Sequence, residues 1–313
     1  MINTAQFYGQ RALVTGASGF IGSHLCRRLH SAGAEVHGIS RNEKTEDVAC
    51  SRWWQSDLGD IGDLRHILSI VKPDLVFHLA SHVAGARSMD LVLPTLYSNL
   101  LSTVNLLMAV TETGCKRILL TGSLEEPEPG SSWAVPSSPY AAAKYASSAY
   151  GRMFHALYQT PIVILRLFMV YGPGQKDLKK LIPYVTLSLL QGHTPNLSSG
   201  IRKVDWVFVD DVVDGFLMAA QAEGVVGGTI ELGSGQLVSV RTVVDKLVEI
   251  INPNLIPTFG TLPDRAFEQE RVANIAETYA KLRWEPETTL EAGLKQCADW
   301  YRDRLRQGIA GTP

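Results

Sequence analysis

The sequence predicts an α/β protein with a doubly wound parallel sheet and a smaller α/β region toward the C-terminus. Short apolar runs alternate with longer segments of helical periodicity through the first half of the chain. These runs lack the polar alternation of half-exposed strands, which indicates strands buried on both faces. A glycine-rich turn joins the first run to the first helical segment. Such strand–helix alternation is typical of a parallel sheet covered by helices on both sides.

The first 170 residues carry the regular part of this pattern. Buried strands are predicted at Arg11–Thr15, Glu35–Ser40, Asp74–Leu79, Lys116–Thr121 and Pro161–Leu167. The helices predicted between them are Ile21–Ala32, Leu64–Val71, Leu96–Thr113 and Pro139–Tyr158. Because a helix separates successive strands, each connection can cross the sheet and leave its strands parallel.

The pattern is less regular after residue 170. We expect helices at Leu181–Gln191 and from Val212 to about Ala222, a strand at Asp205–Val209, a strand–turn–helix over Thr229–Ile251 and a mostly helical end at Ala273–Arg306. The predicted division is therefore a first domain of residues 1–170 and a second region of residues 171–313, with some segments returning to the first sheet. Loops over the strand ends are where α/β proteins build specificity.

The composition describes an ordinary globular protein. The 313 residues are 45% hydrophobic and 19% charged, with a net charge of −2, so no basic field is available to hold nucleic acid or an anionic membrane. The four cysteines form no CxxC, which argues against a zinc site or a disulfide framework. Residues Met1–Gln10 lack an apolar run, and the longest apolar stretches are strand-length. We therefore expect a cytoplasmic protein without a membrane span.

The glycine-rich turn has the spacing of a dinucleotide-binding loop. It reads Thr-Gly-Ala-Ser-Gly-Phe-Ile-Gly, directly after a strand and at the start of a helix. Gly16 would allow a tight turn, Gly19 a close approach of backbone to a pyrophosphate, and Gly22 close packing of helix on strand. A glycine triplet alone is a weak signal, but this one lies in the first strand–turn–helix unit. The cofactor contacts predicted here are Gly16, Ser18, Gly19, Phe20, Ile21 and Gly22.

The end of the second strand decides which dinucleotide is favoured. An acidic residue there would hold a ribose 2′-hydroxyl and favour NAD(H). This sequence has Ser40 and Arg41 instead. A hydroxyl and a guanidinium can bind a 2′-phosphate, which a carboxylate would repel. NADP(H) is therefore the predicted cofactor, with NAD(H) as the alternative; Arg41 could also be simply a solvated turn residue.

A Tyr–Lys pair supplies the predicted chemistry. Tyr140 and Lys144 are four residues apart, after Ser138 as a helix N-cap and Pro139 at the first helical position, so both side chains should lie on one helix face. A free tyrosine has a pKa of about 10 and is a poor acid–base group at neutral pH. A cation one turn away stabilises the phenolate, as proton transfer to or from a hydroxyl or carbonyl requires.

The ordered motifs resemble those of the extended short-chain dehydrogenases/reductases, the nucleotide-sugar epimerase/dehydratase group. They are TGASGFIG, Asp57-Leu58, HLAS at His78–Ser81, Asn99, YAAAK at Tyr140–Lys144, and YGPG at Tyr171–Gly174, with VDDV at Val209–Val212 and Trp284-Glu285-Pro286 further on. The resemblance spans nearly the whole chain. It implies a Rossmann domain for residues 1–170 and a mainly substrate-binding region for residues 171–313.

The resemblance also implies residue roles. Asp57 and Leu58 would meet the adenine. Lys144 would hold the nicotinamide ribose, and Ser123 would share the substrate oxygen with Tyr140. The further cofactor contacts that it implies are Leu79, Ala80, Ser81 and Asn99.

Several positions depart from the family pattern. Leu124 stands where dehydratases of the group often have an acid, and Glu125 follows it as a candidate base or an ordinary loop carboxylate. Met169 replaces a common substrate-binding asparagine. Arg202 could serve a sugar diphosphate from a shifted position, and Arg265 resembles a late arginine that holds it. The candidate substrate-binding residues are thus Met169, Arg202 and Arg265.

The NADP(H) preference and the missing acid lead us to expect an NADPH-dependent reductase. The family resemblance implies its substrate, a keto group of a nucleotide-linked sugar of the 4-keto-6-deoxyhexose type. The alternative is a nucleotide-sugar epimerase or 4,6-dehydratase that retains its NAD(P). A more remote one is a non-catalytic NADP(H)-sensing protein. His78 and His82 are four residues apart, but they lie where a strand ends and not on one face of a helix, so no metal site is predicted. The resemblance also implies a homodimer formed through the helices at Leu96–Thr113 and Pro139–Tyr158.

Overall fold

The computed structural model describes residues 6–43, 49–127, 135–264 and 269–308. The chain divides into two compact units. The first comprises Met1–Leu167, Val213–Glu231 and Glu277–Trp284. The second comprises Phe168–Val212, Leu232–Ala276 and Glu285–Pro313. The chain therefore leaves the first unit and returns to it twice.

The first unit is built on a seven-stranded sheet, which confirms the predicted fold class. Its strand order is β3-β2-β1-β4-β5-β6-β9, and every pairing from β3 through β6 is parallel. This is the Rossmann order, in which the chain changes direction across the sheet between β1 and β4. The strands are β1 (Arg11–Thr15), β2 (Glu35–Ser40), β3 (Arg52–Gln55), β4 (Leu75–His78), β5 (Arg117–Ser123), β6 (Ile162–Leu167) and β9 (Thr229–Leu232).

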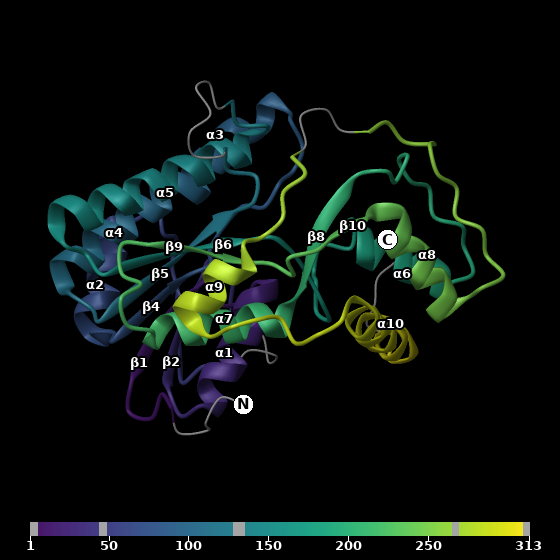
Figure 1. Cartoon of the computed structure of the whole chain (residues 1–313). Helices are drawn as coiled ribbons and strands as arrows, with labels where there is room; N and C mark the ends of the chain where they lie inside the picture. The colour runs from purple at the N-terminus through teal and green to yellow at the C-terminus, as the bar shows by residue number, and fades with distance from the viewer. Residues whose placement is uncertain (1–5, 44–48, 128–134, 265–268, 309–313) are drawn as a thin grey trace. The chain divides into compact units, whose positions relative to one another are not determined.

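Helices cover both faces of this sheet (Figure 1). Successive strand side chains point to opposite faces. On β4, Val76 therefore joins the cluster under one set of helices, while Phe77 lies 6.4 Å from Phe216 of α7, measured between ring centroids. The helices of this unit are α1 (Phe20–Ser31), α2 (Ile61–Val71), α4 (Ser102–Thr113), α5 (Pro139–Tyr158), most of α7 (Val209–Gln221), and α9 (Ile275–Leu282).

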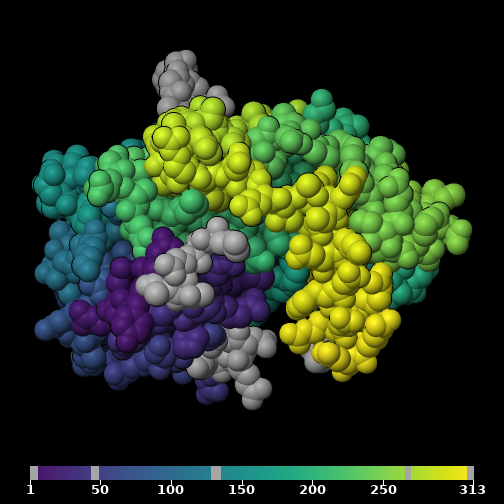
Figure 2. Space-filling view, turned by 60° about the horizontal axis from the view of Figure 1, so that its bottom comes forward, coloured from purple at the N-terminus to yellow at the C-terminus, as the bar shows by residue number. Residues whose placement is uncertain are grey.

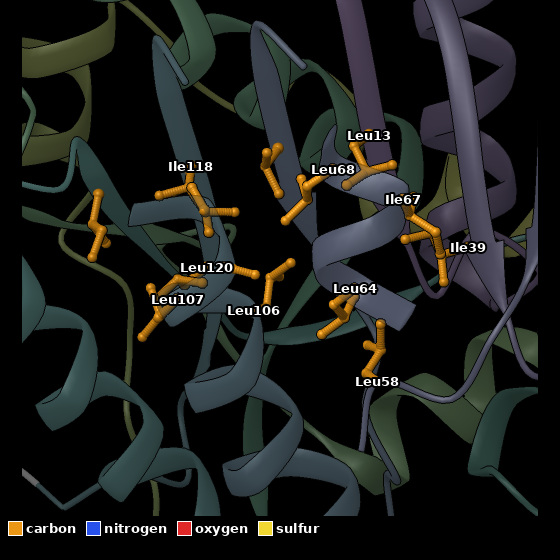
Figure 3. Close-up of a cluster of buried hydrophobic side chains, with 14 of the residues drawn as sticks. Leu13, Ile39, Leu58, Leu64, Ile67, Leu68, Leu106, Leu107, Ile118 and Leu120 are labelled. Carbon is orange, nitrogen blue, oxygen red and sulfur yellow. The ribbon is translucent and has the colours of Figure 1, made fainter. Parts of the chain in front are cut away.

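The main core of the first unit lies between the sheet and helices α2, α4 and α5 (Figure 3). Leu64, Leu68, Leu106 and Leu107 from the helices are all inaccessible to solvent. They meet strand residues such as Ile118. Burying a leucine of this kind stabilises a fold by roughly 1.5–3 kcal/mol relative to leaving it exposed, so this cluster holds the helices against the inner strands of the sheet.

The predicted helix Leu96–Thr113 is part of a longer composite helix. A 3₁₀ turn (Met89–Leu91), α3 (Val92–Thr95), a π-helical segment (Leu96–Leu101) and α4 follow without interruption. Within the described ranges, Met89–Thr113 is the one helical stretch long and apolar enough to cross a membrane. Its residues Leu106 and Leu107 belong to the core beneath the sheet.

The second unit has a three-stranded sheet, in which β8 lies between β10 and β7. The strands are β7 (Met169–Tyr171), β8 (Lys203–Phe208) and β10 (Leu237–Ser239). Three helices pack with one another in this unit, namely α6 (Leu181–Leu190), α8 (Val240–Ile251) and α10 (Leu290–Arg306). Helix α10 buries one stripe, including Leu294 and Tyr301, and its exposed side lies within the yellow surface of Figure 2.

Two local expectations differ from the structure. Strand β3 was not expected, because its sequence Arg-Trp-Trp-Gln lacks the apolar run of the inner strands. The predicted helix start at Val212 is also wrong, since α7 begins at Val209. Asp211 consequently lies in the first helical turn rather than before it. Its carboxylate accepts hydrogen bonds from the backbone nitrogens of Glu287 and Thr288, at 3.2 and 3.1 Å.

Candidate active site

The glycine loop has the geometry that dinucleotide binding requires. Gly16 has φ of +68°, and a Cβ built there would lie 2.7 Å from the backbone nitrogen of Ala80. A Cβ on Gly22 would lie 2.1 Å from the carbonyl oxygen of Gly16. Gly19 is the N-cap of α1 and offers no side chain to cap its amides. These amides at a helix N-terminus can therefore receive a pyrophosphate.

This loop lies against the segment that follows β4, on the other side of the strand-order reversal. The contact is direct, because Gly16 meets the backbone of Leu79 and Ala80. His78, at the end of β4, is buried and shares hydrogen bonds with Thr15 (2.8 Å) and Thr103 (2.9 Å). Burial lowers the pKa of His78 to about 3, so the ring is neutral and serves to join β1, β4 and α4. Ligands of open α/β sheets bind at this switch point.

The residues at the end of β2 lie beside the glycine loop. The hydroxyl oxygens of Ser18 and Ser40 are 2.8 Å apart. Arg41 is exposed, and its carbonyl oxygen accepts a hydrogen bond from Gln55 at 3.1 Å. The structure thus brings Ser18 and Ser40 together, next to the exposed Arg41. Among the described residues, the last position of β2 is Ser40 and the next is Arg41, so neither carries a carboxylate.

The segment expected to meet the adenine is held by a residue that the sequence did not single out. Asn105 of α4 donates to the carbonyl oxygens of Leu58 and Gly59, each at 3.0 Å. Leu58 is buried, whereas Asp57 is exposed and accepts from the backbone nitrogen of Gly59 at 2.8 Å. An asparagine on an otherwise apolar helix face was the available signal for this anchor.

The Tyr–Lys pair lies on α5 as predicted. Ser138 caps the helix by accepting from the backbone nitrogen of Ala141 at 3.1 Å, and Pro139 occupies the first turn. The Ser123 and Ser81 hydroxyls lie within hydrogen-bonding reach of the Tyr140 phenol, and both lower its pKa against the larger effect of burial. The structure therefore joins the predicted catalytic tyrosine and serine.

Lys144 lies one helical turn after Tyr140 on α5 and is buried. Its ammonium donates to the carbonyl and hydroxyl oxygens of Thr121, each at 3.0 Å. An ammonium has three hydrogens, so these two bonds orient the third. Thr121 was not expected to take part, although its place at the carboxyl end of β5 is where a parallel sheet presents functional side chains.

Burial opposes ionisation of both groups of the pair. It raises the pKa of Tyr140 above its ordinary value, while the bond to Ser123 acts in the other direction. Burial lowers the pKa of Lys144 to about 8, and the Glu126 carboxylate opposes this shift. Titratable groups with perturbed pKa values are typical of acid–base sites.

The loop after β4 is held by Asn99. Its side-chain oxygen accepts from the Ser81 hydroxyl at 3.2 Å and from the His82 backbone nitrogen at 2.6 Å, and its amide donates to the His82 carbonyl at 3.2 Å. Asn99 lies in the π-helical segment, a form of helix that often occurs at functional sites. The structure thus gives Asn99 contact with Ser81, a neighbour of the phenol.

The turn after β5 holds two glutamates with different surroundings. Glu125 accepts from the Ser138 hydroxyl at 3.3 Å, and its backbone nitrogen donates to the Ser123 hydroxyl at 3.2 Å. Glu126 is fully buried and accepts from the Ser123 backbone nitrogen at 2.7 Å. Leu124, which precedes them, is buried and carries no acid. The Glu125 charge therefore acts on the Tyr140 phenol, while Glu126 binds the backbone of Ser123.

The predicted substrate-binding residues belong to the second unit or lie outside the described residues. Met169 is half-buried on β7, where it pairs with Trp206 of β8. Arg202 is half-buried just before β8. Arg265 lies outside the described residues. Their roles stay predictions.

A buried carboxylate in the second unit was not expected to be a structural centre. Asp205 accepts hydrogen bonds from the backbone nitrogens of Ser234, Gly235 and Ala273, and from the Ser234 hydroxyl. It therefore holds two distant segments together rather than facing a ligand. Residues in the described ranges include no group of three or more His, Cys, Asp or Glu suited to hold a metal ion.

Strand order, switch-point glycines and a serine-bound tyrosine define an enzyme that uses a nicotinamide dinucleotide for hydride transfer. The chain belongs to the NAD dependent epimerase/dehydratase family, whose model matches residues 12–233. It is thus an extended short-chain dehydrogenase/reductase, as its motifs indicated.

Individual relatives agree with this assignment. The chain is 30% identical to a UDP-glucose 4-epimerase of Mycolicibacterium smegmatis, covering 94% of this chain and 99% of the relative. It is 27% identical to a dTDP-D-glucose 4,6-dehydratase of Mus musculus, covering 94% and 89%. Among solved structures, the UDP-glucose 4-epimerase of Thermotoga maritima with UDP-glucose matches with a TM-score of 0.87 and 27% identity, covering 94% and 99%. That of Thermus thermophilus with NAD matches with a TM-score of 0.83 and 26% identity, covering 93% and 99%.

Proposed function

We propose that this enzyme is a nucleotide-sugar epimerase, which inverts a hydroxyl-bearing carbon of a UDP-linked hexose through transient oxidation. The observation that carries this proposal is the Tyr140 phenol bonded to Ser123 beside a buried Lys144. Relatives named as UDP-glucose and UDP-glucuronate 4-epimerases support it. They fit better than the reductase expected from the sequence.

The residues of the site suit this reaction. A bound nicotinamide dinucleotide would accept hydride from the sugar carbon and return it to the opposite face. Tyr140 would take the hydroxyl proton and give it back, and Ser123 would orient the oxygen. Lys144 would favour the phenolate through its charge. Leu124 cannot donate a proton to a leaving hydroxyl, so the site favours epimerisation over 4,6-dehydration.

The experiment is a product assay with purified enzyme. UDP-glucose, UDP-galactose and UDP-glucuronate would each be incubated with NAD⁺ or NADP⁺, and the sugars separated by chromatography. We expect a 4-epimer to form with no net change in absorbance at 340 nm. Formation of a 4-keto-6-deoxy product would refute epimerisation in favour of dehydration.

The second candidate is the NADPH-dependent reductase of a nucleotide-linked keto-sugar. It is favoured by one observation, the Ser40 hydroxyl beside Ser18 with Arg41 next in the chain, an arrangement suited to a 2′-phosphate. A reductase draws on the NADPH pool at each turnover. Steady NADPH oxidation with a nucleotide 4-keto-sugar, and no epimer from the unoxidised sugars, would establish this function instead.

We propose NADP(H) as the preferred cofactor on the same observation, with NAD(H) as the alternative. Family members such as the Thermus thermophilus enzyme are described with NAD. Calorimetric titration with each dinucleotide distinguishes the two. Equal or tighter binding of NAD(H) would overturn the preference.

We also propose a homodimer formed through α5 and the composite helix. Large apolar side chains are exposed on these elements, including Leu93, Tyr97, Leu157 and Tyr158. Exposed apolar surface of this kind is typical of an interface. Light scattering after size exclusion should give twice the chain mass. Monomeric wild-type protein would contradict the proposal.

A further inference from the structure

The buried Glu126 carboxylate is joined to the catalytic serine in two directions. Its Oε1 accepts a hydrogen bond from the Ser123 backbone nitrogen at 2.7 Å, and its own backbone nitrogen donates to the Ser123 carbonyl at 3.1 Å. A Cβ on Gly122 would lie 2.7 Å from the same Oε1. The carboxylate therefore occupies the space beside Gly122, near the end of strand β5. It fixes the backbone that carries the Ser123 hydroxyl.

The charge of Glu126 is only partly matched by its nearest cation. Its side chain is 1% exposed, and its Oε2 lies 3.7 Å from a guanidinium nitrogen of Arg166. Arg166 makes a shorter contact, 3.0 Å, with Glu231 on β9. Within the part of the chain that the structure describes, Oε2 of Glu126 accepts no hydrogen bond. One guanidinium thus serves two carboxylates, which leaves negative charge at Glu126 without a full counter-charge.

The second cation on which the Glu126 charge acts is Lys144, whose ammonium binds Thr121, two residues before the Ser123 that Glu126 holds on the same strand. The ammonium is buried, and burial lowers its pKa to about 8 while the Glu126 charge raises it. The same carboxylate also raises the pKa of Tyr140, after the larger effects of burial, Ser123 and Glu125. Glu126 thus acts on both members of the proton-transferring pair, although it belongs to neither.

We propose that Glu126 is a positioning residue of the active site, which fixes the turn bearing Ser123 and supplies the buried negative charge that keeps Lys144 in its ammonium form. This inference rests on the proposed role of Tyr140 and Lys144 in proton transfer. The Arg166 guanidinium attracts the Glu126 carboxylate, and Glu231 on β9 forms an ion pair with the same guanidinium.

The charged and titratable groups around the pair come from five elements. They are His78 on β4, Glu125 and Glu126 after β5, Tyr140 and Lys144 on α5, Arg166 on β6 and Glu231 on β9. His78 is neutral above about pH 3, because burial opposes its charging. Among these groups, the charge that acts on Lys144 is therefore that of Glu126.

The test compares Glu126→Gln with Glu231→Gln. Glutamine keeps an oxygen for the Ser123 nitrogen but removes the charge, whereas the control removes the other carboxylate on Arg166. Without the Glu126 charge, both Lys144 and Tyr140 lose protons at lower pH. We expect both limbs of the kcat–pH profile of Glu126→Gln to move down by roughly one pH unit. The profile of Glu231→Gln should move much less, because Glu231 acts on Arg166 and not directly on Lys144, and KM should change little in either variant.

A second measurement does not depend on the substrate. Tyrosine labelled with ¹³C at Cζ gives one NMR signal per ring, and the Tyr140 signal is identified by its loss in Tyr140→Phe. Its titration in the NADP⁺ complex should move to lower pH in Glu126→Gln only. If no sugar is turned over but this titration moves, the proposed function fails and the role of Glu126 stands.

Unchanged profiles and titrations in Glu126→Gln would overturn the inference, as would equal shifts in the two variants. A third variant covers the case in which Glu126→Gln does not fold. Glu126→Asp keeps the charge but draws it back from the Ser123 nitrogen. It should retain the wild-type pH profile with a kcat lowered roughly tenfold, the loss of about one hydrogen bond. A shifted profile in Glu126→Asp would refute the charge role.

Discussion

Replacement of Gly16 by alanine tests the cofactor loop most sharply. A Cβ at this position would lie 2.7 Å from the backbone nitrogen of Ala80, whereas ordinary contacts begin at 3.4 Å. The loop and the segment after β4 must then separate by about 0.7 Å, the difference between these distances. Forcing such overpacking costs about 1–3 kcal/mol. The left-handed backbone, φ of +68°, adds about 1 kcal/mol for any residue with a Cβ.

Gly9 provides a matched control. Its φ of +75° is nearly the same, but nothing lies within 4 Å of a Cβ built there. Gly9→Ala should therefore lower the free energy of unfolding by about 1 kcal/mol, and Gly16→Ala by about 2–4 kcal/mol. Urea denaturation followed by circular dichroism measures both. In calorimetric titrations, Gly16→Ala should bind NADP(H) at least roughly tenfold more weakly, because the displaced amides no longer meet the pyrophosphate together.

The reasoning would be refuted by a simple result. If Gly16→Ala and Gly9→Ala lose the same stability and bind the dinucleotide with equal affinity, the close approach of the loop to Ala80 has no energetic weight. A loss of stability in Gly16→Ala without loss of affinity would separate the two claims. That outcome would support the steric conflict between residue 16 and Ala80, and it would contradict the binding of a pyrophosphate at this loop.

Three further predictions concern single side chains. Arg41→Ala should weaken NADP(H) binding roughly tenfold in calorimetry and leave NAD(H) unchanged; no effect on either dinucleotide would make Arg41 a solvated turn residue, and equal weakening of both would contradict a contact with the 2′-phosphate. Tyr140→Phe should lower kcat roughly 10³-fold with unchanged dinucleotide affinity, and retained turnover would exclude the phenol as the acid–base group. The pKa of His78 is lowered to about 3 in the folded state, so the unfolded chain binds the extra proton first and stability falls as pH drops from 6.5 toward 3. That loss of unfolding free energy is up to roughly 1.4 kcal/mol per pH unit and is measured by urea denaturation across this pH range. It should vanish in His78→Asn and persist in His66→Asn, a control at an exposed histidine. An unchanged pH dependence in His78→Asn would contradict the lowered pKa of His78.

Local sequence patterns were sufficient for the elements that frame the site. The inner strands are apolar on both faces, and the glycine loop specifies its own turn, so both follow from a few adjacent residues. The cap at Ser138 and the spacing of Tyr140 and Lys144 likewise depend only on helix geometry. These features were predicted and found.

Contacts between distant segments could not be predicted in this way. Glu126, which follows β5, contacts Arg166 on the neighbouring strand β6. Asp205 accepts hydrogen bonds from Ser234 and Ala273. Nothing in the spacing of these residues reveals their partners, because only the folded sheet brings them together. Strand β3 was missed for a related reason, since its polar ends hide a strand that is held by pairing with β2.

The π-helical segment Leu96–Leu101 has a consequence for the tolerance of this chain to insertions and deletions. A π turn holds more residues per turn than an α turn, so it keeps a surplus within an unbroken helix. Removing one residue there would restore an α-helix, and α4 would keep its register with α3 because the π turn held that residue as a surplus. Leu106 and Leu107 would stay in the core, but the wide turn that places Asn99 against the loop at His82 would be lost. The length of this segment therefore sets the position of Asn99 rather than the packing of α4.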